Sequence, residues 1–386
     1  MHKPINRTGS FGGNVSMGKP APPKGNRPTR NTQSQPKKQT QTTKTTKKQT
    51  PAPERPARSV DKPNTNLISL PDQQKMLNLF SQAFNAELTS PDFTNTLQAV
   101  KQGLFDRDFE RVFGDEANLR VYAARYSPTR ALGYAEVLSG IFEHLELLLP
   151  AETGPDEKTP AILNMVSIGG GAAEVAAFAA YLSQAPDRSG AVTLIDSGPW
   201  GAIVDSLASH VTTPPILPQW ANAEAMANNR SLIEPARLAA KFLQKDVLSS
   251  ELVGIFPDEG PCLVTLFFTL NELFTAGGIG KTTQFLLDVT AVIPSGSLLL
   301  VVDSPGSYSE ATVGKEAKKY PMLWLLDKVL ATAEDCTWQK MESQESRWFR
   351  LPEKLTYPIP LENMRFQMHL YRAKKPVFQA KSNSES

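Results

Sequence analysis

Cysteine and histidine are scarce in this 386-residue chain, which has two of the former and four of the latter. The two cysteines, Cys262 and Cys336, exclude a disulfide framework and a cysteine-rich zinc site, and the histidines show no metal-ligand spacing. The chain also lacks an apolar run of about 18 residues, the length of a membrane span, and a hydrophobic signal core at its start. We therefore expect a soluble, intracellular protein in a reducing compartment, without a metal.

Acidic residues are almost absent from the first sixty positions. Residues 1–60 contain 13 Lys and Arg but a single acid, Glu54, which leaves 28 basic and 38 acidic residues to positions 61–386. The near-neutral total thus conceals a tail of about +12 on a body of about −10. Because the tail has almost nothing apolar to bury, we predict that residues 1–62 are disordered, and residues 376–386 likewise. The basic tail suits contacts with nucleic-acid phosphates or a nuclear import signal, and a solvated tail without a partner is the alternative.

Helical periodicity dominates residues 63–150. Apolar side chains recur at helical spacing over residues 71–88, and residues 90–92 (Ser-Pro-Asp) have the capping pattern of a new helix. Residues 127–129 (Ser-Pro-Thr) repeat that pattern and predict another helix start. We therefore expect an N-terminal segment of three or four helices, followed by a polar connection.

The pattern changes to alternating strands and helices between residues 151 and 375. Short, continuously apolar runs predict strands buried on both faces, which is typical of a parallel sheet with helices between its strands. Two later runs, separated by about thirteen residues without a helical pattern, predict a closing antiparallel pair. The expected parallel strands are 162–168, 191–196, 239–248, 263–270 and 297–303, the antiparallel pair is 347–350 and 364–371, and a helix is expected over 282–293.

Three consecutive glycines, Gly169, Gly170 and Gly171, follow the first predicted strand and precede an Ala-rich helical pattern. Glycine lets the chain turn without a Cβ clash and lets a ligand approach the backbone. Such a strand–turn–helix unit holds nucleotide-like ligands in open α/β sheets. Glu174 departs from the dinucleotide pattern, which needs a small residue where the helix packs on the sheet. It counts against an NAD(P)-binding oxidoreductase, which is the main alternative.

Polar side chains follow the other predicted strands, at the edge where an open sheet binds its ligand. Asp196 closes the second strand, where a carboxylate can accept from both ribose hydroxyls, and Asp246 closes the third, where it can accept from an adenine amino group. Asn271 and Glu272 close the fourth strand, and Asp303 closes the fifth. A helix cap explains any one of these residues, but the whole set beside a glycine turn favours a ligand site.

Residues 276–283 (Ala-Gly-Gly-Ile-Gly-Lys-Thr-Thr) resemble a phosphate-binding loop. Such a loop needs a glycine six positions before Lys281, where Thr275 stands instead, and it should follow its strand directly. Residues 271–274 intervene here. We therefore do not favour an ATPase, and we expect a flexible loop ahead of the following helix.

Longer segments give the sequence a specific resemblance. Residues 167–174 (Ser-Ile-Gly-Gly-Gly-Ala-Ala-Glu), 268–274 (Phe-Thr-Leu-Asn-Glu-Leu-Phe) and 299–308 (Leu-Leu-Val-Val-Asp-Ser-Pro-Gly-Ser-Tyr) carry it. Together they resemble the fungal 25S ribosomal RNA uridine-N3 methyltransferases, which have the class I fold and depend on S-adenosylmethionine (SAM). Residues 126–131 and 365–372 fit the same family, and the likeness covers roughly residues 67–375.

The resemblance implies a class I SAM-methyltransferase fold of the α/β class, with a Rossmann-like sheet and a terminal antiparallel hairpin. In this interpretation the methyltransferase domain spans 151–375, and the helical segment 63–150 and the basic tail 1–62 precede it. The resemblance also implies SAM as the cofactor and large-subunit ribosomal RNA or a pre-ribosome as the partner. We expect a monomer without a membrane partner, in the nucleus or nucleolus with the cytoplasm as the alternative.

The site residues are our own inference from the strand ends. Gly169, Gly170, Gly171, Asp196 and Asp246 would bind the cofactor, and Asn271, Glu272 and Asp303 would serve the reaction. Glu272 or Asp303 would accept the proton of uracil N3, and Asn271 would hydrogen-bond the uracil edge. Three aromatic residues are candidates to stack on the base: Tyr126, Trp200 and Tyr308. A catalytically inactive methyltransferase fold that only binds RNA in ribosome assembly is the remaining alternative.

Overall fold

The computed structural model describes residues 67–150, 161–217, 219–249, 251–252, 254–257, 260–306, 308–313 and 316–376. For residues 308–319 the description covers the backbone of the strands and no side chains. The two predicted disordered tails fall outside these ranges, apart from Pro376. Among the described residues, no helix has the length and apolar character that crossing a membrane requires.

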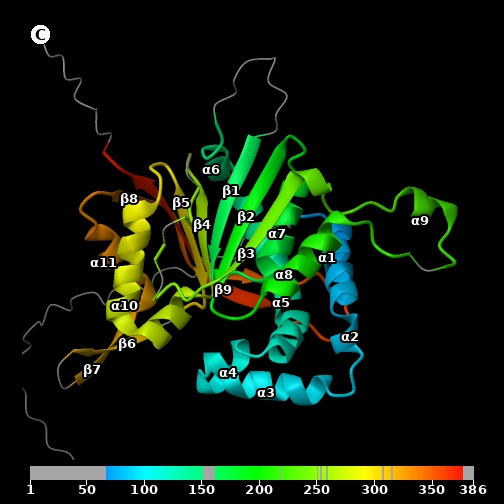
Figure 1. Ribbon diagram of the computed structural model, residues 1–386, viewed down its shortest axis with the longest axis horizontal. Coiled ribbons are helices and arrows are strands. Elements are labelled where there is room, and N and C mark those ends of the chain that lie inside the picture. Colours follow the sequence, from blue (N-terminus) through cyan, green and yellow to red (C-terminus); the bar gives the residue numbers. More distant parts are fainter. Residues whose placement is uncertain are drawn as a thin grey trace, which may run out of the picture. The chain divides into compact units, whose positions relative to one another are not determined.

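A seven-stranded sheet organises the described chain (Figure 1), with the strand order β3-β2-β1-β4-β5-β9-β8. The first five strands of that order run parallel, while β9 is antiparallel to both β5 and β8. This confirms the predicted parallel sheet with a closing antiparallel pair. The strands are β1 (Ala161–Ile168), β2 (Arg188–Asp196), β3 (Leu238–Gln244), β4 (Leu263–Phe267), β5 (Leu298–Asp303), β8 (Thr337–Phe349) and β9 (Met364–Lys374).

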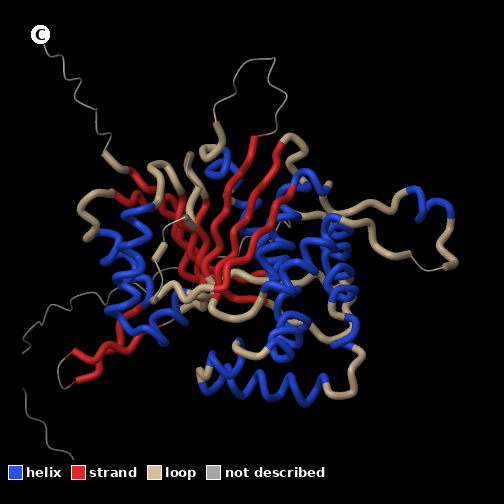
Figure 2. Tube along the Cα trace, viewed as in Figure 1, coloured by secondary structure: helices blue, strands red, loops and turns tan. Residues whose placement is uncertain are grey.

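Helices cover both faces of this sheet, as Figure 2 shows. Side chains alternate along each strand, so Leu163 and Met165 of β1 join one apolar core while Val166 and Ile168 join the other. Every residue of β4 and β5 is buried, which is why these strands read as unbroken apolar runs. The first core includes α7 (Ala172–Ser183) and α8 (Gly201–Thr212), and the second includes α10 (Leu270–Val292) and α11 (Met322–Ala331).

The N-terminal helices join the first of these cores, and α5 packs along α7. The predicted helical character of this segment is therefore confirmed for the residues that the structure describes, but it contains six helices rather than three or four, since α2, α4 and α6 are additional short helices. Its helices are α1 (Leu70–Ala83), α2 (Asn85–Leu88), α3 (Phe93–Asp106), α4 (Phe109–Phe113), α5 (Glu116–Gly140) and α6 (Phe142–Glu146).

The predicted helix start at residues 127–129 is wrong, because α5 continues through Pro128. Proline has no N–H to donate, so the carbonyl of Ala124, four residues earlier, loses its helical partner. The hydroxyl of Tyr357 donates to that carbonyl at 2.8 Å instead. A long-range contact thus offsets a local helix breaker, and residue spacing could not have revealed it.

The predicted end of the fourth strand is also wrong. The strand ends at Phe267, Phe268 has a φ of +55°, and α10 begins at Leu270, well before the expected helix at 282–293. Residues 277–281 therefore lie within α10, where Gly278 interrupts the helical backbone with a φ of +66°. The expected flexible loop is a kinked helix. Similarly, β3 stops at Gln244, so Asp246 lies two residues beyond it.

The remaining elements are short connections around this framework. They are the short helices α9 (Ala223–Ala227) and η1 (Pro235–Arg237) and the hairpin strands β6 (Tyr308–Val313) and β7 (Glu316–Pro321). In Figure 1, α9 lies on a loop that extends away from the sheet.

Candidate active site

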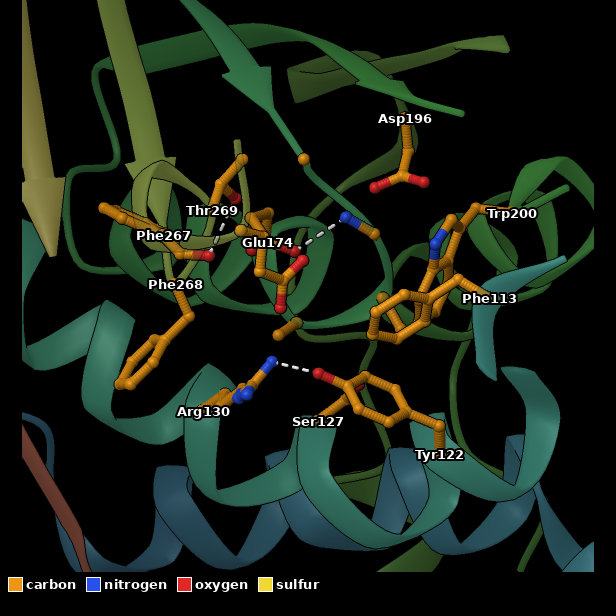
Figure 3. A pocket seen from close by; sticks show the side chains of 15 residues that line it. Phe113, Tyr122, Ser127, Arg130, Glu174, Asp196, Trp200, Phe267, Phe268 and Thr269 are labelled. Carbon is orange, nitrogen blue, oxygen red and sulfur yellow. Dashed lines mark hydrogen bonds between the residues drawn. The ribbon is translucent and has the colours of Figure 1, made fainter. Parts of the chain in front are cut away.

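The carboxyl ends of the parallel strands meet at one edge of the sheet. The pairing register places Ile168 of β1 beside Ile195 of β2 and Leu266 of β4, so the chain segments that follow these strands emerge together. Two adjoining cavities open at this edge. The inner cavity, of about 40 Å³, is drawn in Figure 3. The outer cavity, of about 570 Å³, falls within the usual size range of small-molecule sites. Their shared walls are Phe113, Gly169, Asp196, Thr269 and Glu272.

The glycine turn lines the cavities with bare backbone. Gly169 has a φ of +69°, and a Cβ there would lie 2.2 Å from the hydroxyl oxygen of Thr269. A Cβ on Gly171 would lie 2.9 Å from the ring of Trp200. Thr269 and Trp200 occupy the space that a side chain on these glycines would need, so the turn contributes only main chain to the cavity walls. Gly170 lines neither cavity, because its Cβ position faces Ser167 on the inside of the turn.

The N–H groups of this turn are already engaged. Those of Gly169 and Gly170 donate to the carbonyl of Ile195 at 2.7 and 3.3 Å, and that of Gly171 donates to Oε2 of Glu174 at 2.8 Å. A dinucleotide pyrophosphate needs free N–H groups and the positive end of the helix dipole at this point. Here a carboxylate occupies the start of α7, which disfavours the NAD(P) alternative.

Asp196 and Asp246, the predicted cofactor acids, both line the outer cavity. One oxygen of Asp196 accepts from the N–H of Gly198 at 2.7 Å, and burial raises its pKa to about 6. Asp196 also lines the inner cavity. Asp246 is more exposed, and its carboxylate accepts from the N–H of Leu248 at 2.9 Å and the hydroxyl of Ser249 at 2.8 Å.

Glu272 and Glu174 bring two further carboxyl groups to the inner cavity. Glu272 is partly buried, and burial raises its pKa to about 8, with Arg130 opposing the shift and Asp196 and Asp303 adding to it. Burial likewise raises the pKa of Glu174 to about 7, although the N–H of Gly171 favours its charged form. Both groups therefore change charge near neutral pH, which is common at functional sites.

Among the described residues that line the inner cavity, Arg130 is the one arginine. Arg130 of α5 donates a hydrogen bond to the hydroxyl of Tyr122, and its guanidinium lies 4.8 Å from the ring centroid of Phe268 (Figure 3). Burial opposes its charge, but Tyr122 and the neighbouring glutamates raise its pKa above the ordinary value.

Sequence reasoning missed Arg130 and Tyr122 because the predicted helix start at 127–129 divided them between two elements. Their separation of eight residues, just over two helical turns, places them on one face of an unbroken helix. That spacing was the available signal.

The three predicted catalytic residues are not gathered in one cavity. Glu272 lines both cavities, whereas neither Asn271 nor Asp303 lines either of them. Asp303 is 1% exposed, and its two oxygens accept from the N–H groups of Asn271 at 3.0 Å and Ser304 at 2.7 Å. It therefore caps the start of α10 from the end of a neighbouring strand. Burial raises its pKa to about 6 despite these bonds.

Two other groups of predicted residues differ in their placement. Gly277 and Lys281 line the outer cavity, but from within α10 rather than from a loop that follows a strand. Trp200 is 5% exposed and lies against the glycine turn in the inner cavity, while Tyr126 lies outside both cavities. The side chain of Tyr308 falls outside the description.

The combined site suits a ligand with a positive charge and a diol. Carboxyl groups outnumber the single guanidinium of the inner cavity, so a cation that enters would reduce their mutual repulsion and favour their charged forms. A carboxylate at the end of β2 is placed to accept from two hydroxyls, and exposed backbone at the glycine turn admits an extended group. These features fit the sulfonium, ribose and methionine parts of SAM.

Comparison with known proteins agrees with this chemistry. Residues 80–372 match a family of SAM-dependent methyltransferases. The 25S rRNA (uridine(2843)-N(3))-methyltransferase of Saccharomyces cerevisiae is 31% identical over 350 residues, which cover 82% of this chain and 89% of the yeast protein.

Solved structures resemble the fold more distantly. The 16S rRNA (adenine(1408)-N(1))-methyltransferase from Catenulisporales acidiphilia is 16% identical, with a TM-score of 0.33, and covers 59% of this chain and 96% of its own. Human N-acetylserotonin methyltransferase in complex with SAM is 14% identical, with a TM-score of 0.31, and covers 74% and 69%. These identities and TM-scores are too low to support a conclusion about function. The match to residues 80–372 and the yeast relative suffice, and the chain belongs to the SAM-dependent methyltransferase family that includes the yeast 25S rRNA uridine-N3 methyltransferase.

Proposed function

We propose that this protein transfers a methyl group from SAM to N3 of a uridine in large-subunit ribosomal RNA. The observation that carries the proposal is the 31% identity to the yeast enzyme over most of both chains. The acid-rich site at the glycine turn supports the cofactor part of the proposal independently of that identity.

The cofactor residues take distinct roles in this proposal. The backbone of Gly169 and Gly171 lines the methionine part, Asp196 accepts from the ribose hydroxyls, and Asp246 accepts from the adenine amino group. Gly170 shapes the turn. When bound, SAM supplies a methyl group made electrophilic by the sulfonium.

Uracil N3 carries a proton and is a poor nucleophile until that proton leaves. Glu272 is the base in our proposal, because it alone of the three predicted catalytic residues lines both cavities. A pKa of about 8 makes it a stronger base than an ordinary carboxylate, and a base is most effective when its pKa lies near the working pH. The carboxylate accepts the N3 proton as the methyl group is transferred.

Arg130 and Asp303 support this step in different ways. Loss of the N3 proton leaves negative charge on the uracil oxygens, which the guanidinium of Arg130 stabilises from the wall of the inner cavity. Asp303 holds the N–H of Asn271 at 3.0 Å and so positions the helical turn that carries Glu272. Asn271 lines none of the cavities at this edge, so the predicted contact of its side chain with the uracil edge is not part of this proposal.

The proposed substrate sets the expected partner and place of action. Ribosomal RNA or a pre-ribosome is the partner, and the nucleus or nucleolus is where it is assembled. The thirteen basic residues among positions 1–60 are available for phosphate contacts there.

The test is mass-spectrometric analysis of nucleosides from ribosomal RNA of cells that lack this gene. We expect 3-methyluridine to be lost from the large-subunit RNA, and a plasmid encoding the wild type to restore it. A plasmid encoding Asp196→Ala should not restore it, because the reaction needs bound SAM. A module that merely binds RNA would not depend on Asp196 in this way. Unchanged 3-methyluridine in the deletion strain would refute the proposal.

A further inference from the structure

An exposed aromatic residue lies beside two arginines at the end of the terminal hairpin. Trp348 of β8 is 39% exposed, and the guanidinium carbons of Arg350 and Arg365 lie 5.2 and 5.8 Å from its ring centroid. Trp348 and Arg365 are direct partners in the β8–β9 register. We call these three residues the Trp348 strip. Aromatic rings flanked by cations are how proteins hold single-stranded nucleic acid, since bases stack on the ring and phosphates pair with the cations.

The Trp348 strip lies at the same edge of the sheet as the active site. Asp303, which ends β5, pairs with Gln367 of the antiparallel strand β9. The start of β9 and the end of β8, where Phe349 pairs with Met364, therefore extend past the carboxyl ends of the parallel strands. The sheet topology alone thus brings the strip beside the cavities.

A third cavity, the side cavity, joins the strip to the active site. It has a volume of about 200 Å³, below the range for drug-sized ligands. Arg130 and Phe268 form one wall and also line the inner cavity, whereas Arg365 of the strip forms another. In Figure 3, Phe268 and Arg130 lie on the side of the inner cavity away from Asp196. The side cavity therefore adjoins the proposed reacting centre from the side opposite the ribose carboxylate.

The walls of the side cavity are aromatic and cationic. Tyr126 contributes its ring, with the guanidinium of Arg125 5.2 Å from the ring centroid. Phe268 contributes a second ring, from a residue whose φ of +55° is unusual for a bulky side chain. The one acid in the lining, Glu362, forms an ion pair with Arg125 at 2.6 Å. Such walls suit a pyrimidine, whose flat face stacks on the rings and whose carbonyl oxygens accept from the guanidiniums.

Charge distribution distinguishes the strip from the rest of the body. Positions 61–386 carry 38 acidic and 28 basic residues, so most of this body repels a polyanion. Two arginines beside an exposed tryptophan supply local positive charge at the edge where the active-site cavities open. This complementarity favours RNA over an apolar protein segment as the occupant.

We propose that the side cavity receives the target base, between Tyr126 and Phe268, while the Trp348 strip binds the adjoining nucleotides of a single-stranded RNA. The inference rests on the proposed function, since it assumes an RNA substrate. N3 lies on the pairing edge of uracil, so the base must leave any duplex before it reacts. A cavity of one-base size with an external stacking platform serves such an extruded nucleotide.

The test uses the full-length protein and a fluorescent, single-stranded, uridine-containing oligoribonucleotide, with anisotropy measured at several salt concentrations. Trp348→Ala should weaken binding about 5- to 150-fold, the usual cost of losing one base stack. Arg350→Ala with Arg365→Ala should lower the slope of log K against log salt by about 1.4, or 0.7 for each lost phosphate contact. SAM affinity, measured by calorimetry, should not change in any of these variants.

A matched control comes from the α9 loop, which carries the 85%-exposed Trp220 and the exposed Arg230. Trp220→Ala with Arg230→Ala should retain the RNA affinity of the wild type. If the wild type methylates RNA but the strip variants bind it equally well with the same salt slope, the strip inference is wrong and the proposed function stands. A wild type that binds SAM yet neither binds nor methylates RNA would refute the proposed function itself.

The side cavity has its own test. Tyr126→Ala should slow methylation of the same oligonucleotide at least about tenfold, while Tyr126→Phe, which keeps the ring, should stay near the wild type. SAM affinity should be the same in both variants. Equal rates for Tyr126→Ala and the wild type would exclude this cavity as the base site.

Discussion

The hydroxyl of Tyr357 donates a 2.8 Å hydrogen bond to the main-chain carbonyl of Ala124, one turn before Pro128 in helix α5. This contact lets α5 run unbroken past a proline. It thereby keeps Tyr122 and Arg130 on one helical face, where both line the inner cavity. The geometry of the active site thus depends on a segment more than two hundred residues away in the chain.

Tyr357→Phe should lower the free energy of unfolding by about 1–3 kcal/mol, the cost of leaving a buried carbonyl without a partner. Chemical denaturation followed by circular dichroism measures it. Tyr320→Phe, at a ring that stacks on Trp324 at 5.2 Å, is the control and should stay within about 0.5 kcal/mol of the wild type. Equal stability of both variants would mean that α5 tolerates Pro128 for another reason.

Asp196→Ala should weaken SAM binding about a hundredfold or more, since two hydrogen bonds to a charged group are lost at about 1.5–3 kcal/mol each. Calorimetry measures the affinity, and thermal melting checks that the fold is intact. Asp187→Ala, in the exposed turn before β2, removes the same charge at the other end of the strand and should bind normally. Unchanged affinity for Asp196→Ala would remove this residue from the cofactor site.

Glu272→Gln should lower kcat by about 10²- to 10⁴-fold, the usual contribution of a general base. Because only the ionised carboxylate accepts a proton, kcat/KM for SAM of the wild type should rise with pH through about 8, the pKa of Glu272 in the free protein. The residual activity of Glu272→Gln should lack this rise. If Glu272→Gln still showed this rise with pH, the base would be another residue, and Asp303→Asn is then the next variant to test.

The raised pKa of Glu272 should increase activity but decrease stability as the pH rises. The pKa of Glu272 is raised from 4.5 to about 8 by folding, so its contribution is fully present at low pH and is lost as the pH rises through about 8. The wild type should therefore lose stability relative to Glu272→Gln as the pH rises from about 5 to about 8. Melting temperatures of the two proteins in parallel buffers measure this difference, and a pH-independent gap would contradict the raised pKa.

Much of the fold follows from local pattern. Continuous apolar runs identified the parallel strands because both faces of the sheet are covered, and Asp196 fell at a strand end because β2 stops where its apolar pattern stops. The predictions failed where a distant partner overrides local chemistry. Tyr357 sustains α5 through Pro128, and Asp303 caps α10 from another strand, which moves Asn271 and Glu272 from a strand end into a helix.

The site was predictable to a similar extent. Acids at strand ends are visible in the sequence, and Asp196, Asp246 and Glu272 all line the cavities. The sequence did not reveal the positive charge of Arg130, which faces these acids. Arg130 reaches the inner cavity from a helix outside the sheet, and no spacing rule within the strand–helix repeat relates it to the acids.

Arg130 influences the pH at which the proposed base, Glu272, becomes charged. Its positive charge lowers the pKa of Glu272 and Asp303 against the effect of burial, and in our proposal it also stabilises charge on the uracil oxygens. Arg130→Gln removes both effects, whereas Arg130→Lys keeps a positive charge but loses the planar contact with Phe268. We expect Arg130→Gln to lower kcat about a hundredfold and to shift the rise of kcat/KM to higher pH, because Glu272 then ionises less readily.

SAM binding separates this electrostatic role from a structural one. Removing a cation from a site that binds a cation should leave the affinity for SAM equal or higher, whereas a collapsed site would lose it. Arg130→Lys should keep the wild-type pH profile with a smaller fall in rate. If Arg130→Gln lowered the rate without moving the pH profile, the guanidinium would act on the substrate alone, and the link between Arg130 and the base would be wrong.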